Sequence, residues 1–447
     1  MAVNNPTNIA SVSEHGLCTG CGTCAAICPR DAVEMLVDRG AGVYVPCLNT
    51  ERCNQCGACL EVCPGRSVDF GRLNLDIFGR KPGDILLGNY ENCYIGYAVD
   101  QAIRYNSTSG GMITALLLYA LEAGAIDGVL VTRTRPDRPL QPEPFIARTR
   151  EEVISAARSK YCPVPANIAL KEILAAKEGE RFAVVGLPCH LHGMRKAEMV
   201  DERLRRAIRI HFGLFCEHVD TFLNTDFMLG RYGIKSEAVA RLDYRGRGWP
   251  GSMVIEKKDG TQTIVPLRRW LIWHGLRLSV PKSCRLCGDE TAELADISFG
   301  DAWLPELQHD HVGTSIIVSR NEVAEQLLRD AVLRGRVVLE KASPRDVVRC
   351  QIDALYRKKK EIGAYMRLFR SDVLQPSNCL HPDTLDHAYA TMQQFNTSVL
   401  FSRRWVWRIL RHTPLGVVRL LLRAPSFGIG RLQMRRVIRQ RYRNHGA

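Results

Sequence analysis

The sequence predicts an α/β fold around a largely parallel sheet, with a cysteine-rich module before it and a basic helical tail after it. The chain has 447 residues, 46% of them hydrophobic and 24% charged, which is the composition of a core-forming protein larger than one ordinary domain. Cysteines crowd its N-terminal part, and apolar β-type runs alternate with helical patterns from about residue 90 to 350. These features exclude a peptide-sized binding module and a disordered or fibrous protein.

Strands are expected at short apolar runs, and helices at the longer periodic stretches between them. The expected strands of the parallel sheet are residues 127–132, 181–186 and 207–215, with helices at 110–124 and 166–179. Two later runs, 252–258 and 261–267, flank an Asp-Gly turn and predict an antiparallel hairpin added to this sheet. We therefore divide the chain into a module at 14–72, an α/β domain with α+β elements at 90–350, and a tail at 387–447.

The basic charge of the protein is concentrated in the tail. No acidic residue follows Asp386, whereas twelve arginines do, against a formal net charge of +14 for the whole chain. From Phe401 to Arg423 these arginines recur three and four residues apart, with Trp405 and Trp407 elsewhere around the expected helices. Such helices suit contact with an anionic membrane surface, and they equally suit packing of their apolar side on the protein's own domain. No nucleic-acid partner is expected, because no nucleic-acid-binding fold is recognisable.

The cysteine content and the N-terminal residues together predict a cytoplasmic protein. The first residues contain neither a basic start nor an apolar stretch typical of a secretory signal, and no run of 18 apolar residues occurs anywhere. In a reducing compartment, the 17 cysteines are expected to bind metal in preference to forming disulfides. Through its tail, the protein is also a candidate for a peripheral position at the inner face of the membrane.

A duplicated cysteine motif predicts two [4Fe-4S] clusters in the N-terminal module. Each copy places three cysteines two residues apart, then a fourth after three more residues and directly before a proline. In such motifs the fourth cysteine ligates the other cluster. Cluster one is therefore assigned to Cys18, Cys21, Cys24 and Cys63, and cluster two to Cys53, Cys56, Cys59 and Cys28. Zinc is disfavoured, because zinc sites use two-plus-two spacing. This part resembles a bacterial two-cluster ferredoxin, and Cys47, outside the pattern, is expected to be an ordinary thiol.

Four further cysteines predict a third metal centre in the α/β domain. Cys189 and Cys216 each follow an expected strand, and the carboxyl ends of parallel strands meet at one edge of a sheet. Cys284 and Cys287 form a Cys-x2-Cys pair on a later loop and complete a set of four thiols. We interpret the set as a third [4Fe-4S] cluster, although this spacing alone also fits zinc.

A candidate cofactor site begins at the polar, glycine-rich segment before the helix expected at 110–124. Ser and Thr are expected to cap this helix, while Ser107, Ser109, Gly110 and Gly111 would let its free amides bind a phosphate. A second segment, Arg158-Ser159-Lys160, adds two cations that suit a flavin or simply solvate a loop. No GxGxxG motif follows a strand, so an ordinary dinucleotide site is not indicated.

The order of these motifs resembles that of the coenzyme F-420 hydrogenase and dehydrogenase beta subunits. The resemblance runs from about residue 14 to 345, and its most specific element is CRLCGDETAELADISFGDAW. It implies FAD and [4Fe-4S] clusters, with Ser107, Ser109, Gly110, Gly111, Arg158, Ser159 and Lys160 lining the flavin and Cys189, Cys216, Cys284 and Cys287 holding a cluster. One departure is His190, which stands where the family usually has glutamine.

The resemblance implies an oxidoreductase that passes electrons between reduced coenzyme F-420, or a related substrate, and one-electron carriers such as a ferredoxin or another redox partner protein. Because a deazaflavin gives up two electrons and each cluster accepts one, FAD would stand between them. Lys160 or Arg158 would offset charge on the reduced flavin. His190 and His192 are either proton relays or histidines with ordinary partners. The alternative function is a non-catalytic electron-transfer or assembly subunit, which would need clusters but no flavin.

Overall fold

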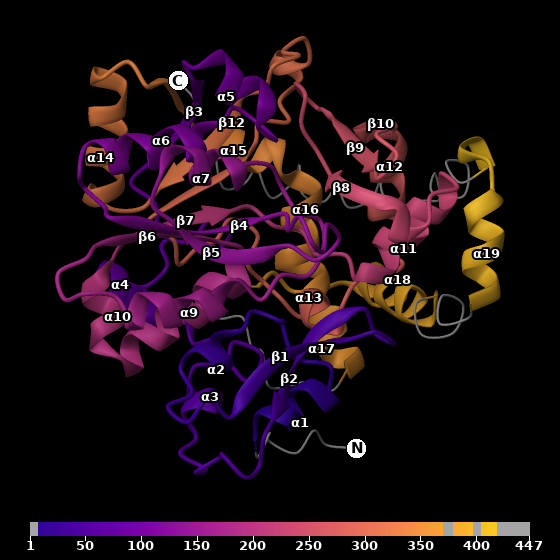
Figure 1. Cartoon of the computed structure of the whole chain (residues 1–447), viewed down its shortest axis with the longest axis horizontal. Coiled ribbons are helices and arrows are strands. Elements are labelled where there is room, and N and C mark those ends of the chain that lie inside the picture. The colour runs from indigo at the N-terminus through magenta and orange to yellow at the C-terminus, as the bar shows by residue number, and fades with distance from the viewer. Residues whose placement is uncertain (1–7, 370–378, 397–403, 418–447) are drawn as a thin grey trace.

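An eight-stranded mixed sheet forms the centre of the protein (Figure 1). The computed structural model describes residues 8–369, 379–396 and 404–417. In spatial order the strands are β13 (Val337–Ala342), β3 (Asn92–Ala98), β12 (Ser315–Ser319), β11 (Ile297–Asp301), β7 (Ile208–Leu214), β6 (Phe182–Gly186), β4 (Gly128–Arg133) and β5 (Glu143–Ala147). The predicted α/β class is confirmed. The parallel part is limited to β4, β6, β7 and β11, because β5 and β12 join its two sides antiparallel.

Helices cover both faces of this sheet, and each face has its own apolar core (Figure 1). On one face lie α5 (Gln101–Asn106), α6 (Met112–Glu122), α7 (Arg150–Ser155) and α14 (Glu322–Leu333). On the other lie α4 (Phe70–Phe78), η1 (Ala166–Ala169), α8 (Leu170–Leu174), α9 (Pro188–Val200) and α10 (Glu202–Ala207). With both faces covered, strands such as β4 and β12 are apolar and buried along most of their length, as expected for central strands.

The cysteine-rich module packs below the sheet, against α9 and η1. It contains α1 (Ile9–Glu14), α2 (Thr23–Ala26), the hairpin of β1 (Val33–Asp38) and β2 (Val43–Leu48), and α3 (Ala58–Glu61). The buried Asn167 amide donates a 2.7 Å hydrogen bond to the Thr23 hydroxyl, and a Cβ at Gly193 would lie 2.2 Å from the same oxygen. Glycine at 193 therefore permits the close contact that holds the module against α9.

A second, three-stranded sheet contains β8 (Val239–Asp243), β9 (Ser252–Lys257) and β10 (Gln262–Pro266). The predicted antiparallel hairpin forms as β9 and β10, but the expectation that it extends the main sheet is wrong, because it pairs with β8 instead. Helices η2 (Ser236–Ala238), α11 (Phe222–Arg231) and α12 (Leu267–Gly275) accompany it, and Trp270 and Trp273 of α12 are buried in their shared core.

The remaining helices lie in the chain between β10 and the basic tail. They are α13 (Lys282–Arg285), η3 (Pro305–Leu307), α15 (Pro344–Cys350), α16 (Ile352–Tyr356), a π-helical turn η4 (Arg357–Glu361), α17 (Ile362–Phe369) and α18 (Thr384–Phe395). Helix α18 packs on α17 and begins three residues before the expected start of the tail, so the tail is joined to the domain by a regular helix. Among the described residues, no helix is long and apolar enough to cross a membrane.

Beyond α18, the described part of the basic tail contains helix α19 (Arg404–His412), which lies along α11 (Figure 1). Arg231 of α11 donates hydrogen bonds of 2.8 to 2.9 Å to the carbonyl oxygens of Leu410, Arg411 and Thr413 at the end of α19. The Trp407 ring packs edge-on against Phe227, whereas Trp405 is 57% exposed. Part of the apolar side therefore packs on the protein's own domain. The rest of the expected tail, at 397–403 and 418–447, lies outside the described residues.

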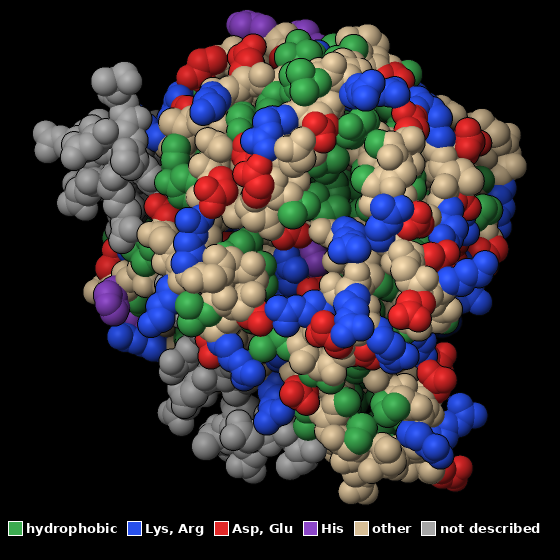
Figure 2. All heavy atoms as spheres, turned by 90° about the vertical axis from the view of Figure 1, so that its left-hand side faces the viewer, with side chains coloured by type: hydrophobic (Ala, Val, Ile, Leu, Met, Phe, Trp, Pro, Cys, Tyr) green, Lys and Arg blue, Asp and Glu red, His purple; other side chains and the backbone are tan. Residues whose placement is uncertain are grey.

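Charges on the face in Figure 2 alternate in sign, with Lys and Arg interspersed among Asp and Glu. This pattern agrees with the concentration of uncompensated arginines after Asp386 in the sequence. The high net charge of the chain therefore does not produce a broad basic surface on this face.

Candidate functional site

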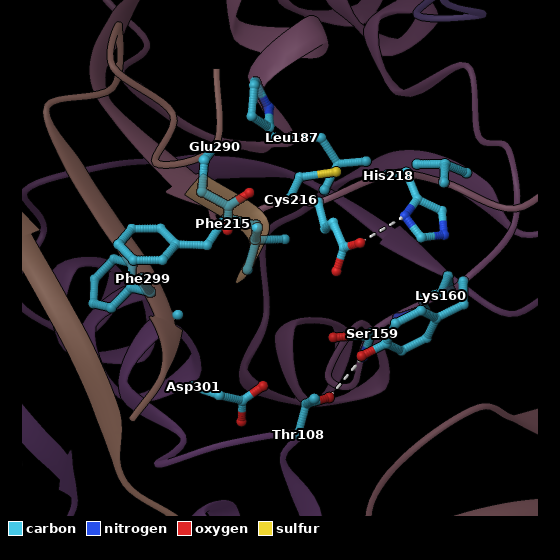
Figure 3. Close-up of a pocket in the computed structure, with 18 of the residues that line it drawn as sticks. Thr108, Ser159, Lys160, Leu187, Phe215, Cys216, His218, Glu290, Phe299 and Asp301 are labelled. Atoms are coloured by element: carbon cyan, nitrogen blue, oxygen red, sulfur yellow. Dashed lines mark hydrogen bonds and ion pairs between the residues drawn. The ribbon is translucent and has the colours of Figure 1, made fainter. Parts of the chain in front are cut away.

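A cavity of about 1110 Å³ opens beyond the carboxyl ends of β6 and β7, where ligands bind in open α/β sheets. Its wall includes the start of α6, residues 156–164, the loops after β6 and β7, and Cys18, Thr19 and Gly20 of the N-terminal module. Figure 3 shows Thr108 and Asp301 across the cavity from Cys216 and Glu290. The cavity therefore contains both sites that the sequence predicts in the α/β domain, and it also reaches the module.

The four cysteines assigned to the third centre come together in the wall of this cavity. Cys189 begins α9 directly after β6, Cys216 follows β7, and Cys284 and Cys287 lie in and after α13. Burial raises the pKa of Cys189 well above its ordinary value, and the neighbouring thiols Cys216, Cys284 and Cys287 raise it further. Four thiols that oppose one another's ionisation in a buried space fit a metal cluster, whose positive charge allows all four to be thiolates.

The eight cysteines of the N-terminal module form two groups. Burial raises the pKa of Cys24, followed by the thiols Cys21, Cys63 and Cys18, so these four lie within electrostatic range of one another. In the second group burial raises the pKa of Cys59, and the thiols Cys28, Cys56 and Cys53 add to it. The structure thus places Cys28 and Cys63 with the other motif's cysteines, as two-cluster ferredoxins require. Backbone amides approach the sulfurs, for example Gly20 N at 3.4 Å from Cys18 Sγ.

The three groups of thiols follow one another from the cavity to the surface. Cys21 of the first module group contributes to the raised pKa of Cys189, and Cys59 of the second group contributes to that of Cys24. Cys56 in the second group is exposed. The four thiols in the cavity wall, which we call the cavity group, therefore come first. The group that contains Cys21 (the first module group) comes next, and the group that contains Cys59 (the second module group) comes last.

The predicted phosphate segment lines the cavity, but its local structure differs from the expectation. Helix α6 has Gly111 as its N-cap, in the left-handed region at φ 75°, with no side-chain cap. The expected Ser or Thr cap is wrong, because the Ser107 and Ser109 hydroxyls donate to the carbonyl oxygens of Ile103 and Thr314. Of the residues that are predicted to line the flavin, Gly110 alone is absent from the cavity wall.

Gly110 lies behind the cavity for a packing reason. Its amide donates to the Ser315 hydroxyl at 3.0 Å, and a Cβ there would lie 2.6 Å from the Gly96 carbonyl oxygen. It is thus a contact point between the turn and strands β3 and β12. The first-turn residues Met112, Ile113 and Thr114 face the cavity instead, and their amides are the donors that a helix N-terminus leaves without intrahelical partners.

The two predicted cations, Arg158 and Lys160, have protein partners. The Lys160 ammonium donates to the carbonyl oxygens of Ala156, Ala157 and Arg158 at 2.6, 3.0 and 2.9 Å, and burial lowers its pKa to about 7. The Arg158 guanidinium pairs with Asp243 and donates to the Asn106 carbonyl oxygen. Ser159, between them, donates its amide to the Thr108 hydroxyl (Figure 3). Their role toward a flavin stays a prediction, and the structure shows each cation bracing the cavity wall.

A buried pair of histidines, which the sequence does not single out, also lines the cavity. The rings of His218 and His274 stack at 3.9 Å between centroids, and His274 Nδ1 lies 2.7 Å from the Asp220 carboxylate. The His218 ring makes no hydrogen bond of ordinary geometry, but its Nδ1 lies 3.5 Å from the Glu217 carboxylate and its Nε2 3.7 Å from the Asp220 carboxylate. Ligand atoms of Glu217, His218 and His274 lie within 4.8 Å of one another. The rings are only 15° from parallel, and Glu217 already pairs with Arg357, so the group is better suited to hydrogen bonding than to holding a metal ion.

By contrast, the two histidines considered as proton relays have ordinary partners. His190 Nδ1 accepts from the Leu187 amide at 3.2 Å, Nε2 lies 3.1 Å from the Val164 carbonyl oxygen, and burial lowers the pKa of this ring to about 4. His192 Nε2 lies 2.9 Å from the Asp289 carboxylate. His190 therefore positions backbone near the cavity, and His192 positions the Asp289 side chain.

The sequence interpretation also misses Lys358, which lies beside the third group of thiols. Its ammonium is 3.4 Å from the Cys284 carbonyl oxygen, and the residue is 4% exposed. Burial lowers the pKa of Lys358, but the charges of Cys287, Cys216 and Cys284 outweigh burial and raise it. The available signal is the run of five charged residues, RKKKE, directly before the apolar IGAY.

A buried charged network fixes the elements that carry Cys189 and Cys216. His211 of β7 lies 2.5 Å from Glu198 of α9 and 3.0 Å from Asp296 before β11, and Arg195 bridges both carboxylates at 3.2 and 2.9 Å. Burial and Arg195 oppose ionisation of His211, but Glu198 and Asp296 outweigh them and raise its pKa. The network thus ties α9, β7 and β11 together below the cavity.

We expect the His211→Gln variant to be less stable by about 1–3 kcal/mol at pH 6. Because the folded pKa of His211 is raised above the unfolded value of about 6.5, its stabilisation is complete below that pH and is lost as pH rises through the folded value. The difference in unfolding free energy from wild type should therefore shrink toward pH 9, as urea titrations can show. Arg209→Gln, at an exposed position of the same strand, is the control, and a difference that grows with pH would contradict the assignment.

Profiles of protein families and several known proteins are similar to this chain. Profiles of the coenzyme F-420 hydrogenase/dehydrogenase beta subunit match residues 93–171 for the N-terminal part and 179–345 for the C-terminal part, and a 4Fe-4S dicluster profile matches 17–66. The beta subunit of the coenzyme F-420 hydrogenase of Methanococcus voltae is 31% identical over 263 residues, covering 58% of this chain and 87% of that protein. One component of the F-420H2 dehydrogenase of Methanosarcina mazei is 27% identical over 76% of this chain and 89% of its own length.

Two further similarities concern larger assemblies. The coenzyme F-420-dependent sulfite reductase of Methanocaldococcus jannaschii is 27% identical over 78% of this chain but only 51% of that protein. One protein chain in the structure of the F-420-reducing nickel-iron hydrogenase complex from Methanosarcina barkeri aligns with a TM-score of 0.50 and 23% identity, over 66% of this chain and 98% of that one. This last similarity supports the fold.

Proposed function

Because the chain belongs to the family of coenzyme F-420 hydrogenase/dehydrogenase beta subunits, and carries a 4Fe-4S dicluster module, we propose that it is an iron-sulfur flavoprotein oxidoreductase. It would pass electrons between a two-electron donor and one-electron carriers. The observation that carries the proposal is that one cavity joins the first turn of α6 to four half-buried thiols. The first candidate donor is reduced coenzyme F-420, after the relatives' names.

FAD is the cofactor we propose for this cavity. When bound, it would accept two electrons together and release them singly. The residues available to hold it are the first-turn amides of Met112, Ile113 and Thr114 for a phosphate, and the polar wall at Thr108 and Ser159. The His218 ring, whose nitrogens lie 3.5 and 3.7 Å from the carboxylates of Glu217 and Asp220, adds a polar side chain to the cavity wall. Lys160 and Arg158 support the wall through the contacts given above.

The order of thiol groups supports a direction for the electron path within the protein. We propose that the cavity group, the first module group and the second module group hold three [4Fe-4S] clusters in series. The second group would meet a redox partner protein, since Cys56 and its loop neighbours Asn54, Gln55 and Gly57 are exposed. The partner would be a ferredoxin or another subunit in the cytoplasm.

Anaerobic reduction of the reconstituted protein tests this function. Reduced F-420 should bleach the flavin absorbance and then reduce an added one-electron protein carrier. In Cys56→Ser, flavin bleaching should persist while carrier reduction slows at least about tenfold, because the outermost cluster loses a ligand. Cys47→Ser, an exposed thiol of the same module outside the motif, should behave as wild type. A folded, iron-replete protein that never binds flavin would favour the electron-carrier alternative, and bleaching only by another donor would overturn the F-420 assignment.

The exposed side of α19 supports a second, separate proposal, peripheral contact with an anionic membrane. Trp405 and Ile409 are 57% and 58% exposed on a helix rich in arginine, while Trp407 packs on the domain. Replacing Trp405 and Ile409 together by glutamate should abolish co-sedimentation with phosphatidylserine vesicles, and salt should weaken it in wild type. If the wild-type protein does not co-sediment with the vesicles at low salt, the membrane proposal is wrong and α19 serves only to pack on the domain.

A further inference from the structure

The π-helical turn Arg357–Glu361 places five consecutive charged side chains in the protein interior or at its margin. Four of them have a charged partner on another segment: Arg357 with Glu217, Lys359 with Glu293, Lys360 with Asp383 and Asp386, and Glu361 with Arg277. The residues of this π turn thus have partners on several different segments, and such turns are frequent at functional sites. The turn is therefore an electrostatic junction between C-terminal helices and the cavity.

Lys358 differs from the other residues of this turn. Within the described part of the chain no carboxylate forms an ion pair with it, and its hydrogen bond is to the Cys284 carbonyl oxygen. It lines the cavity together with Cys216, Cys284 and Cys287.

A buried ammonium without a counter-ion is strongly unfavourable, so an anion is expected beside it. A cluster held by four thiolates provides one, and it gains a further negative charge on reduction. The attraction between this charge and Lys358 is therefore stronger in the reduced state. Lys358 also lies beyond residue 345, where the match to the family's C-terminal profile ends.

We propose that Lys358 is a positioning residue that raises the reduction potential of the cluster bound by Cys189, Cys216, Cys284 and Cys287. This inference rests on the third cluster of the proposed function. A raised potential makes that cluster a better acceptor of single electrons from a donor in the cavity. The effect is electrostatic and needs no movement of the chain.

Potentiometry of the full-length, anaerobically reconstituted protein, followed by electron paramagnetic resonance, tests the proposal. The third cluster's signal is identified as the one missing from Cys284→Ser. Lys358→Gln should make reduction of this cluster at least about tenfold less favourable, a lowering of about 59 mV for one electron. Lys358→Arg, which keeps the charge, should stay close to wild type. Lys360→Gln removes a charge from the same turn but on its far side, toward Asp383, and should leave the third potential unchanged.

The possible outcomes separate this inference from the function on which it rests. If Cys284→Ser lacks no signal, the third cluster is absent and the proposed function fails at that point. If the cluster is present and Lys358→Gln leaves its potential unchanged, the role of Lys358 alone is overturned. Should Lys358→Gln lose the cluster, Lys358→Met supplies a chain of similar volume without a donor. Loss of the cluster from Lys358→Gln and Lys358→Met, with its retention in Lys358→Arg, supports a need for the charge. Equal loss of the cluster from all three variants shows that Lys358 has a packing role, and it overturns the proposal.

Discussion

The Cys284→Ser variant is expected to lose about four iron atoms per chain and to keep about eight, since each cubane contains four. The change removes one of four thiols that lie together in the cavity wall, whereas both module groups keep all their cysteines. Iron and acid-labile sulfide, measured after anaerobic reconstitution, report the loss directly. A module that retains its iron would also show that its two centres assemble without the third.

The matched control for this change is Cys350→Ser. Cys350 is buried and lines the same cavity, but its thiol donates to the Val347 carbonyl oxygen and is not among the charged neighbours of Cys189. It should keep all of its iron. Full iron in Cys284→Ser, or zinc in place of iron at this centre in wild type, would refute the third [4Fe-4S] cluster and leave the two module clusters standing.

A second large effect is expected from Thr114→Glu, which should weaken flavin binding at least about a hundredfold. Thr114 is the third residue of α6 and lines the cavity. A carboxylate in the first turn stabilises the helix itself but repels a phosphate on the same amides, by several kcal/mol at ~4 Å in a partly buried site. Flavin content after gel filtration and the flavin dissociation constant measure the effect.

The design separates charge from size and from backbone strain. Thr114→Gln has nearly the same volume without the charge and should retain flavin. Substitution at Gly111 would be less informative, because its φ of 75° and the Arg104 Cα at 3.1 Å from an added Cβ make any side chain there disruptive. Equal flavin loss in the Gln and Glu variants would place the phosphate elsewhere, and full retention in both would remove the start of α6 from the flavin site.

The features that the sequence predicts well are those set by short segments. The duplicated spacing groups Cys18 with Cys63 and Cys28 with Cys59, and the structure brings these thiols together. Cys189 and Cys216 could be paired because each ends a strand of one parallel sheet, and neighbouring strands deliver their ends to one edge. In both cases the local sequence pattern is enough to predict which thiols lie together.

What the sequence does not predict depends on contacts between distant segments. The Ser109 hydroxyl, expected at a helix cap, donates instead to the carbonyl oxygen of Thr314, and Lys160 is turned toward the end of α7. The run RKKKE is typical of a solvated helix face, yet Lys359 is 1% exposed because Glu293, 66 residues away, pairs with it. No local pattern identifies such partners.

The contact of Gly193 with Thr23 has a consequence for how fast electrons can move. Tunnelling between redox centres falls off exponentially with separation, so a module on a flexible linker would spend much of its time too far away to conduct. Here an added Cβ at 193 would lie 2.2 Å from the Thr23 hydroxyl, and the Asn167 hydrogen bond of 2.7 Å reaches the same oxygen. With donor and acceptor held at a fixed separation, internal transfer should be insensitive to solvent viscosity, and only the encounter with an external carrier should slow in glycerol.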